Sequence, residues 1–141
     1  STLSCEGDTT STFSGNSAPD GGGLYAILST LSFGGNSYFE DNHAIGDPGS
    51  NGTGTGGAVC LWDSTASWVG ETEIFNNSAL RAGGGIVMFN STASWDGNTT
   101  VSYNWAGDPD SELDLAGGGG MRMFYGCNAV WGGGTTQFIG N

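Results

Sequence analysis

Short runs in which apolar and polar residues alternate recur along this chain with a period of about 27 residues or more, within the range typical of stacked structural units. The run STASW stands at residues 64–68 and returns unchanged at residues 91–95. Related runs, STLSC, STLSF and CNAVW, stand at residues 1–5, 29–33 and 127–131. The chain therefore divides into four full repeats and one partial repeat, which begin near residues 1, 29, 64, 91 and 127.

The alternation within each run predicts a short strand with one face in a core. Successive side chains of a strand point to opposite faces, so the apolar third and fifth positions should both point inward. The expected inward columns are Leu3, Leu31, Ala66, Ala93, Ala129 and Cys5, Phe33, Trp68, Trp95, Trp131. The expected outward columns are hydroxylic up to the fifth repeat: Thr2, Thr30, Thr65, Thr92, Asn128 and Ser4, Ser32, Ser67, Ser94, Val130.

Each unit contains two more segments of strand character, one that ends shortly before an Asn and one that follows a pair of Gly residues. Three short strands and three turns are what one coil of a parallel β-helix needs, because each strand pairs with its counterpart in the next coil. No helical periodicity competes with this pattern. We predict an all-β fold: a parallel β-helix with about five rungs and three strands per rung, forming one domain over residues 1–141.

The turns of the predicted coil carry residues suited to corners. Asn tolerates left-handed backbone angles and its amide can bond to the next rung, so we expect a hydrogen-bonded ladder. Its members are Asn16, Asn42, Asn77, Asn104 and Asn141. The Gly pairs predict a second corner, where a side chain would clash or φ is positive. Two units are longer than the rest, and their extra residues predict edge loops at 45–55 and 107–117.

Two tetrapeptides alternate through the repeats: FSGN, FEDN and FIGN, relaxed to IFNN and VSYN, and then GGGL, GGAV, GGGI and GGGM. This alternation of Phe-x-x-Asn with Gly-Gly-apolar resembles the polymorphic outer membrane protein repeats of chlamydial autotransporters, which also occur in surface proteins of other bacteria and of algae. The resemblance implies a right-handed parallel β-helix, in a surface domain that serves in adhesion or as a structural stalk. It brings no catalytic residues with it.

Composition and charge limit the kinds of partner that this chain can bind. Two Arg, no Lys and fourteen Asp and Glu give a net charge of -12, which repels phosphate backbones and excludes nucleic acid. No run of 18 apolar residues exists, so we expect no membrane insertion by this segment, and no signal peptide is recognisable at its start. The chain opens inside a repeat, and we expect it to be a piece of something larger.

Several side chains are candidates for binding or modification. Four glycosylation sequons permit an extracellular glycoprotein: Asn51, Asn76, Asn90 and Asn98. An alternating acidic stretch offers oxygen ligands for Ca²⁺, although it lacks the Gly and terminal Glu of an EF-hand loop, and a solvated loop is the alternative. Its members are Asp108, Asp110, Glu112 and Asp114. The three Cys, at 5, 60 and 127, show no metal-ligand spacing, and we expect no other cofactor.

Two enzyme hypotheses follow from the few basic residues. Arg81 and Arg122 could serve a polysaccharide lyase, but they do not occupy equivalent positions in the repeat. His43 is the single histidine and has no triad partner recognisable in the sequence, so we interpret it as a solvent-facing corner residue. We therefore expect a protein that is not an enzyme.

The preferred interpretation is a non-catalytic structural and adhesive module at the cell surface or outside the cell. Its expected partners are other subunits or further solenoid repeats stacked end to end, because unpaired strand edges recruit strands. The alternatives are ice binding through the flat Thr/Ser face, and glycan binding through that face or through exposed aromatics such as Trp62 or Trp105. The candidate binding face consists of Thr2, Thr30, Thr65, Thr92, Ser32, Ser67 and Ser94.

Overall fold

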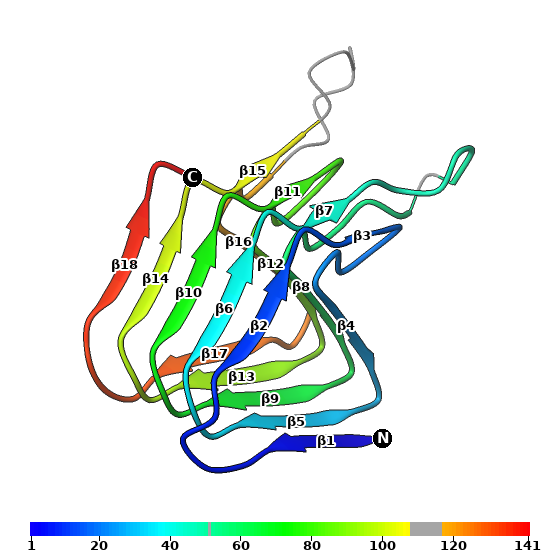
Figure 1. Cartoon of the computed structure of the whole chain (residues 1–141). Helices are drawn as coiled ribbons and strands as arrows, with labels where there is room; N and C mark the ends of the chain where they lie inside the picture. The colour runs from blue at the N-terminus through cyan, green and yellow to red at the C-terminus, as the bar shows by residue number, and fades with distance from the viewer. Residues whose placement is uncertain (51, 108–116) are drawn as a thin grey trace.

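The computed structural model describes residues 1–50, 52–107 and 117–141, and in these ranges the chain winds as a right-handed parallel β-helix (Figure 1). Four parallel sheets form its sides, and every strand pairs with the equivalent strand of the neighbouring coil. The all-β solenoid predicted from the repeat is confirmed.

Two sheets have five strands each. Sheet A carries the STASW-type runs in the order β1-β5-β9-β13-β17, with bounds Thr2–Cys5, Thr30–Phe33, Thr65–Trp68, Thr92–Trp95 and Asn128–Trp131. Sheet B precedes the Asn corner in the order β2-β6-β10-β14-β18, with bounds Ser11–Ser14, Ser37–Glu40, Thr72–Phe75, Thr99–Ser102 and Thr136–Ile139.

The other two sheets have four strands each. Sheet C follows the Asn corner in the order β3-β7-β11-β15, with bounds Ser17–Ala18, His43–Ala44, Ser78–Ala79 and Trp105–Ala106. Sheet D follows the Gly pairs in the order β4-β8-β12-β16, with bounds Leu24–Ile27, Val59–Trp62, Ile86–Phe89 and Met121–Phe124.

The sequence predicts three strands per rung, but complete coils in the described ranges have a fourth, which belongs to sheet C. Its strands are only two residues long, and each pairs in register with its counterpart, as His43 does with Ser78. Two residues are too few for an alternation pattern, so only the pairing between coils reveals them as strands. In the loop predicted at 45–55, residues 45–50 and 52–55 extend from the end of this sheet, and Figure 1 shows them projecting away from the body of the solenoid.

The core is made of side chains that stack from coil to coil. The register pairs Phe33 with Trp68, Trp68 with Trp95, and Trp95 with Trp131. Consecutive ring centroids in this column lie 5.6, 5.0 and 5.3 Å apart, with interplanar angles of 12° or less. Offset stacking of this kind adds to the stabilisation from burial of the rings.

The asparagine column forms a buried ladder at the corner between sheets B and C. Each side-chain amide donates from Nδ2 to Oδ1 of the Asn in the next coil, with distances between 2.9 and 3.0 Å. The same Oδ1 atoms also accept backbone N–H groups of the preceding coil. Buried corner groups are thereby satisfied in a place where the strands turn and cannot pair regularly.

The Gly corner between sheets C and D needs glycine for two reasons. One glycine at each of these corners has positive φ, for example +67° at Gly56. At the next position there is no room for a side chain, because a Cβ on Gly57 would lie 2.1 Å from the Gly84 carbonyl oxygen. These glycines let adjacent coils approach closely enough to pair.

Candidate functional site

Sheet A presents the predicted Thr/Ser face. Its threonines pair in register from coil to coil and are exposed, whereas the serines beside them are half-buried except Ser4. One of these serines, Ser67, donates to the Leu31 carbonyl oxygen at 3.4 Å. The fifth coil ends both hydroxyl columns with Asn128 and Val130. The face is therefore a flat array of Thr side chains four coils long.

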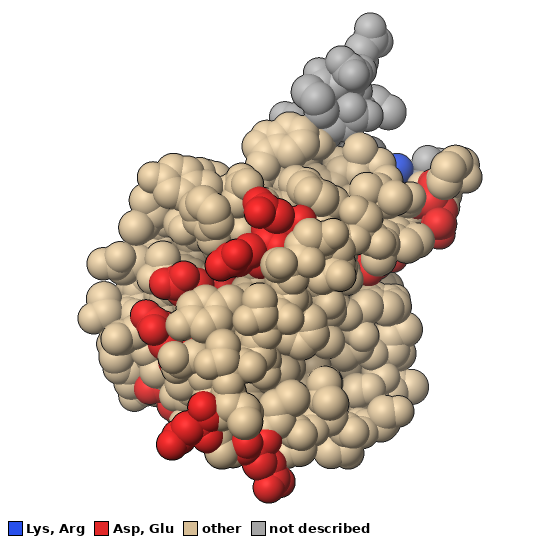
Figure 2. Space-filling model, viewed as in Figure 1, with Lys and Arg blue, Asp and Glu red and all other residues tan. Residues whose placement is uncertain are grey.

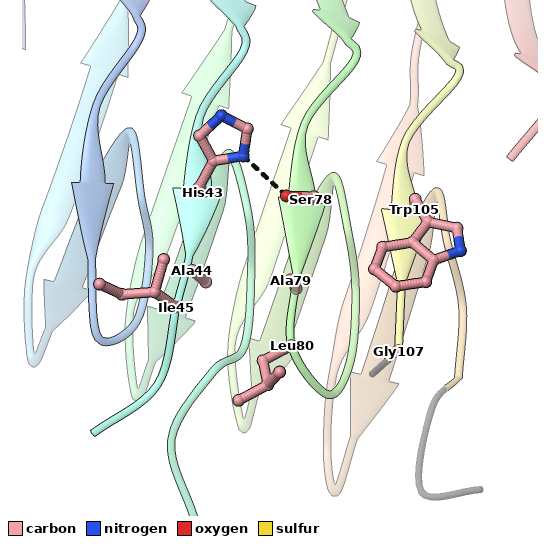
Figure 3. Close-up of a pocket in the computed structure, with 8 residues that line it drawn as sticks. All are labelled: His43, Ala44, Ile45, Ser78, Ala79, Leu80, Trp105 and Gly107. Carbon is pink, nitrogen blue, oxygen red and sulfur yellow. Dashed lines mark hydrogen bonds between the residues drawn. The ribbon is translucent and has the colours of Figure 1, made fainter. Parts of the chain in front are cut away.

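A small depression lies on the outer face of sheet C. Its volume is about 210 Å³. Three consecutive strands supply its upper row, with His43 on β7, Ser78 on β11 and Trp105 on β15 (Figure 3). Ile45, Leu80 and Gly107 supply the lower row.

The depression exists because the middle coil carries a small side chain between two large ones. Ser78 pairs in register with both His43 and Trp105. Since outward side chains of adjacent coils stand side by side, the short serine leaves a gap flanked by the imidazole and the indole. Trp105 is 48% exposed, so one surface of its ring is available to a ligand.

His43 and Ser78 are hydrogen-bonded within this depression. Nδ1 of His43 lies 2.7 Å from Oγ of Ser78, as the dashed line in Figure 3 shows. A Ser–His pair acts as a nucleophile only when a third group orients the imidazole and donors stabilise the oxyanion. In the described part of the chain no carboxylate hydrogen-bonds to His43, and the pair is exposed to solvent. Its geometry suits hydrogen bonding to a bound hydroxyl or amide.

The sequence alone points to His43 and Trp105 as candidate residues but not to Ser78. Ser78 occupies the same repeat position as His43, so alignment of the repeats carries the signal for this contact. The sequence does not reveal the depression itself, because its depth depends on the relative sizes of neighbouring side chains in three coils. Trp62, the other aromatic candidate, lies on sheet D, where its ring packs 4.2 Å from that of Phe89.

The predicted modification sites that the structure describes are all exposed corner residues. Asn76 and Asn90 have φ of +54° and +44°. Their Nδ2 atoms each donate to an aspartate of the preceding coil at 2.6 Å, to Asp41 and Asp63 respectively. Asn98 accepts the backbone N–H of the fifth coil at Thr135, at 2.9 Å.

Other predicted residues fall outside the described ranges. These are the sequon Asn51 and the acidic residues Asp108, Asp110, Glu112 and Asp114. Within residues 1–50, 52–107 and 117–141, no group of three or more His, Cys, Asp or Glu side chains is placed to hold a metal ion. In the same ranges no helix has the length and apolar character required to cross a membrane.

Comparison with known proteins gives one family. Residues 10–27 match the Chlamydia polymorphic membrane protein (Chlamydia_PMP) repeat. The matched segment includes FSGN and GGGL, and in the structure it spans β2, β3 and β4 with both corners between them. The resemblance inferred from the alternating tetrapeptides is thus confirmed. Neither the curated proteins nor the solved structures give a match to the chain.

Proposed function

Because the chain carries a Chlamydia polymorphic membrane protein repeat, we propose that it is a non-catalytic structural and adhesive module of an extracellular or cell-surface protein. In this proposal it forms part of a fibre or larger assembly. The family supports a surface location, and the solenoid supports a structural role, because each coil is built to pair with another coil on both sides.

The observation that supports the structural role is the difference in side-chain exposure between the last coil and the coil before it. Trp131 is 38% exposed, whereas Trp95 one coil before it is 1% exposed. Phe138 is 49% exposed, whereas its paired residue Val101 is 1% exposed. The core columns thus continue to an apolar end face whose strands have free edges, and such edges recruit further strands. We propose that further coils, of the same polypeptide or of another subunit, cover it.

Sedimentation analysis of the purified chain at several concentrations tests this role. We expect concentration-dependent self-association that Phe138→Glu reduces, because a charge on the end face opposes stacking. Gln137→Glu is the matched control, since Gln137 is the neighbouring exposed residue of the same strand and is not part of the core column. Association that is the same in both variants, or absent from the unaltered chain, would count against end-to-end stacking.

For the adhesive part, the depression on sheet C is the proposed contact surface for neutral glycans. A half-exposed indole offers a stacking platform, and the adjacent His43 and Ser78 offer hydrogen bonds to hydroxyl groups. A glycan array probed with the chain should give signals that Trp105→Ala abolishes and Trp62→Ala leaves in place. Equal loss in both variants would show that the depression is not the contact surface.

The non-catalytic part is tested by incubating the chain with acidic polysaccharides and with ester substrates. The Ser78–His43 pair has no orienting acid among the described residues, and on this ground we expect turnover no faster in the unaltered chain than in Ser78→Ala. A rate that falls on this substitution would replace the proposal with a hydrolase.

Ice binding is a second candidate, favoured by the four exposed, in-register threonines of sheet A. Their hydroxyl and methyl groups repeat at the strand spacing of about 4.8 Å. If this face orders water, the chain will shape ice crystals, and Thr65→Tyr will abolish the effect while Gln137→Tyr on sheet B will not. Unshaped crystals in the presence of the unaltered chain would exclude this candidate.

A further inference from the structure

All of the chain's Lys and Arg positive charge converges on one groove. The chain has two such residues, Arg81 and Arg122, against fourteen Asp and Glu. They are far apart in sequence and non-equivalent in the repeat, yet both line a cavity of about 290 Å³ on the outer side of sheet D. Figure 2 shows acidic side chains spread over the face that it views, and basic surface only at its edge.

The fold holds Arg81 at one side of this groove through its backbone. Its N–H donates to the Gly54 carbonyl oxygen at 2.8 Å, and its carbonyl oxygen accepts the Gly117 N–H at 3.3 Å. The neighbouring Thr55 and Ala82 are joined by an isolated parallel bridge. The segments that precede the Gly corner therefore pair from coil to coil and form a wall beside sheet D.

Arg122 forms the other side from within sheet D. It lies on β16 and pairs in register with the buried Val87 of β12. Its Cζ lies 4.6 Å from the centroid of the Phe124 ring, a cation–π distance. Phe124 in turn stacks on Phe89 with centroids 4.6 Å apart and an interplanar angle of 2°. The guanidinium is thus held next to an apolar surface made by two rings.

This combination selects for an anion with an apolar side. Guanidinium groups match the planar carboxylate with paired hydrogen bonds, and a partly dehydrated site strengthens them. The chain carries fourteen Asp and Glu, which repel anions over much of the surface, so an anionic ligand is favoured at the groove that holds Arg122. The Phe rings would pack against the C–H side of a ring that carries the charge.

The size of the groove limits the occupant. Pockets for drug-sized ligands begin at roughly 300 Å³, so about 290 Å³ suits one ring rather than a folded peptide segment. We propose that the groove between Arg81 and Arg122 binds a uronate, a sugar ring with a carboxylate, either free or as a unit of an acidic glycan.

The proposal deepens the adhesive function and rests on it for its biological role. Uronate binding is nevertheless measured on the isolated chain, without any assembly or cell contact. If uronate does not bind, the proposed structural role is unaffected. If the chain does not stack end to end, the proposed uronate site is unaffected.

Calorimetric titration with galacturonate, its trimer, neutral galactose, inorganic phosphate and a short Asp/Glu peptide tests the proposal. We expect uronate binding that weakens when salt is raised from about 0.05 to about 0.5 M, and no salt-dependent binding of galactose. Binding of the monomer as well as the trimer indicates recognition of a free acid, and binding of the trimer alone indicates recognition within a glycan. Peptide or phosphate binding tighter than uronate binding overturns the assignment of the ligand.

Substitutions of Arg122 test whether uronate binds in this groove. Arg122→Gln should weaken uronate binding at least about tenfold, the effect of losing a charged hydrogen bond, and Arg122→Lys should weaken it less because the charge remains. Gln137→Glu makes the same change in net charge on sheet B and should have no effect. Equal affinities of Arg122→Gln and Gln137→Glu overturn the proposal.

One measurement uses the unaltered chain and so does not depend on whether a variant folds. Phenylglyoxal modifies arginine, and this chain has two arginines, so mass spectrometry can follow both in the unaltered protein. Uronate should slow modification of Arg81 and Arg122, and galactose should not. Modification at the same rate with and without uronate overturns the proposal. A separate variant in which the acidic residues at 108, 110, 112 and 114 are neutralised gives a second check. Uronate binding that appears only in that variant also overturns the proposal.

Discussion

Replacement of one asparagine in the middle of the ladder should cost far more stability than replacement of one at its end. Asn77 is buried, and its side chain has five hydrogen-bond contacts, three of which share the two N–H hydrogens of Nδ2. Its Oδ1 accepts from the N–H and Nδ2 of Asn42 at 2.9 Å each. Its Nδ2 donates to the carbonyl oxygens of Phe39 and Phe75 and to Oδ1 of Asn104, at 2.9, 3.0 and 2.9 Å.

The magnitude follows from these contacts. The two N–H hydrogens of Nδ2 and the two bonds that Oδ1 accepts amount to four hydrogen bonds. A net contribution of about 1 kcal/mol for each gives a loss of about 4 kcal/mol in the unfolding free energy of Asn77→Ala. Asn16 is exposed at the first coil, and its Nδ2 makes one ladder bond, to Asn42 at 3.0 Å. Asn16→Ala should therefore cost about 1 kcal/mol.

The assay is guanidinium chloride unfolding followed by tryptophan fluorescence. A difference of about 3 kcal/mol between the two variants is a large share of the stability of a typical domain, so Asn77→Ala should unfold at a clearly lower denaturant concentration than Asn16→Ala. If the two variants differ by less than about 1 kcal/mol, the ladder bonds do not stabilise the corner in the way argued from their number and burial.

Three further perturbations test the core, the Gly corner and the buried thiol. Trp95→Ala should lower the unfolding free energy by about 3–5 kcal/mol, and the half-exposed Trp131→Ala by clearly less, in the same denaturation assay. Gly57→Ala should prevent folding or lower the melting temperature strongly, whereas Gly52→Ala, where a Cβ would have nothing within 4 Å, should not; circular dichroism distinguishes them. Burial raises the pKa of the Cys60 thiol from 9.0 to about 12. Since the unfolded thiol ionises first, the unfolding free energy should fall by up to about 1.4 kcal/mol per pH unit between those values, and Cys60→Ala should remove that slope.

The alternation in residues 64–68 and 91–95 was sufficient to predict sheet A, its register and its buried columns. A period-2 pattern specifies which face is buried, and an exact repeat specifies which residues pair. The asparagine ladder was predictable for the same reason, since one Asn stands at the same place in each repeat. The two-residue strands of sheet C were not, because no pattern exists over two residues.

The two surface sites depend on arrangements that the repeat does not encode. The depression at Ser78 results from side-chain sizes in three successive coils. The groove on sheet D brings Arg81, which precedes a Gly corner, beside Arg122, which follows the next one. Non-equivalent positions of neighbouring coils come to line one groove only when the corner folds, so the sequence does not reveal that these two residues share it.

The mass and shape of the native particle that contains this chain test the central claim most directly. Light scattering together with electron microscopy of unstained material measures both. The account predicts an elongated particle in which coils follow one another with a rise that is a multiple of about 4.8 Å. A compact particle with one copy of the chain and with its end coils open to solvent would contradict the claim that these coils are built to be continued.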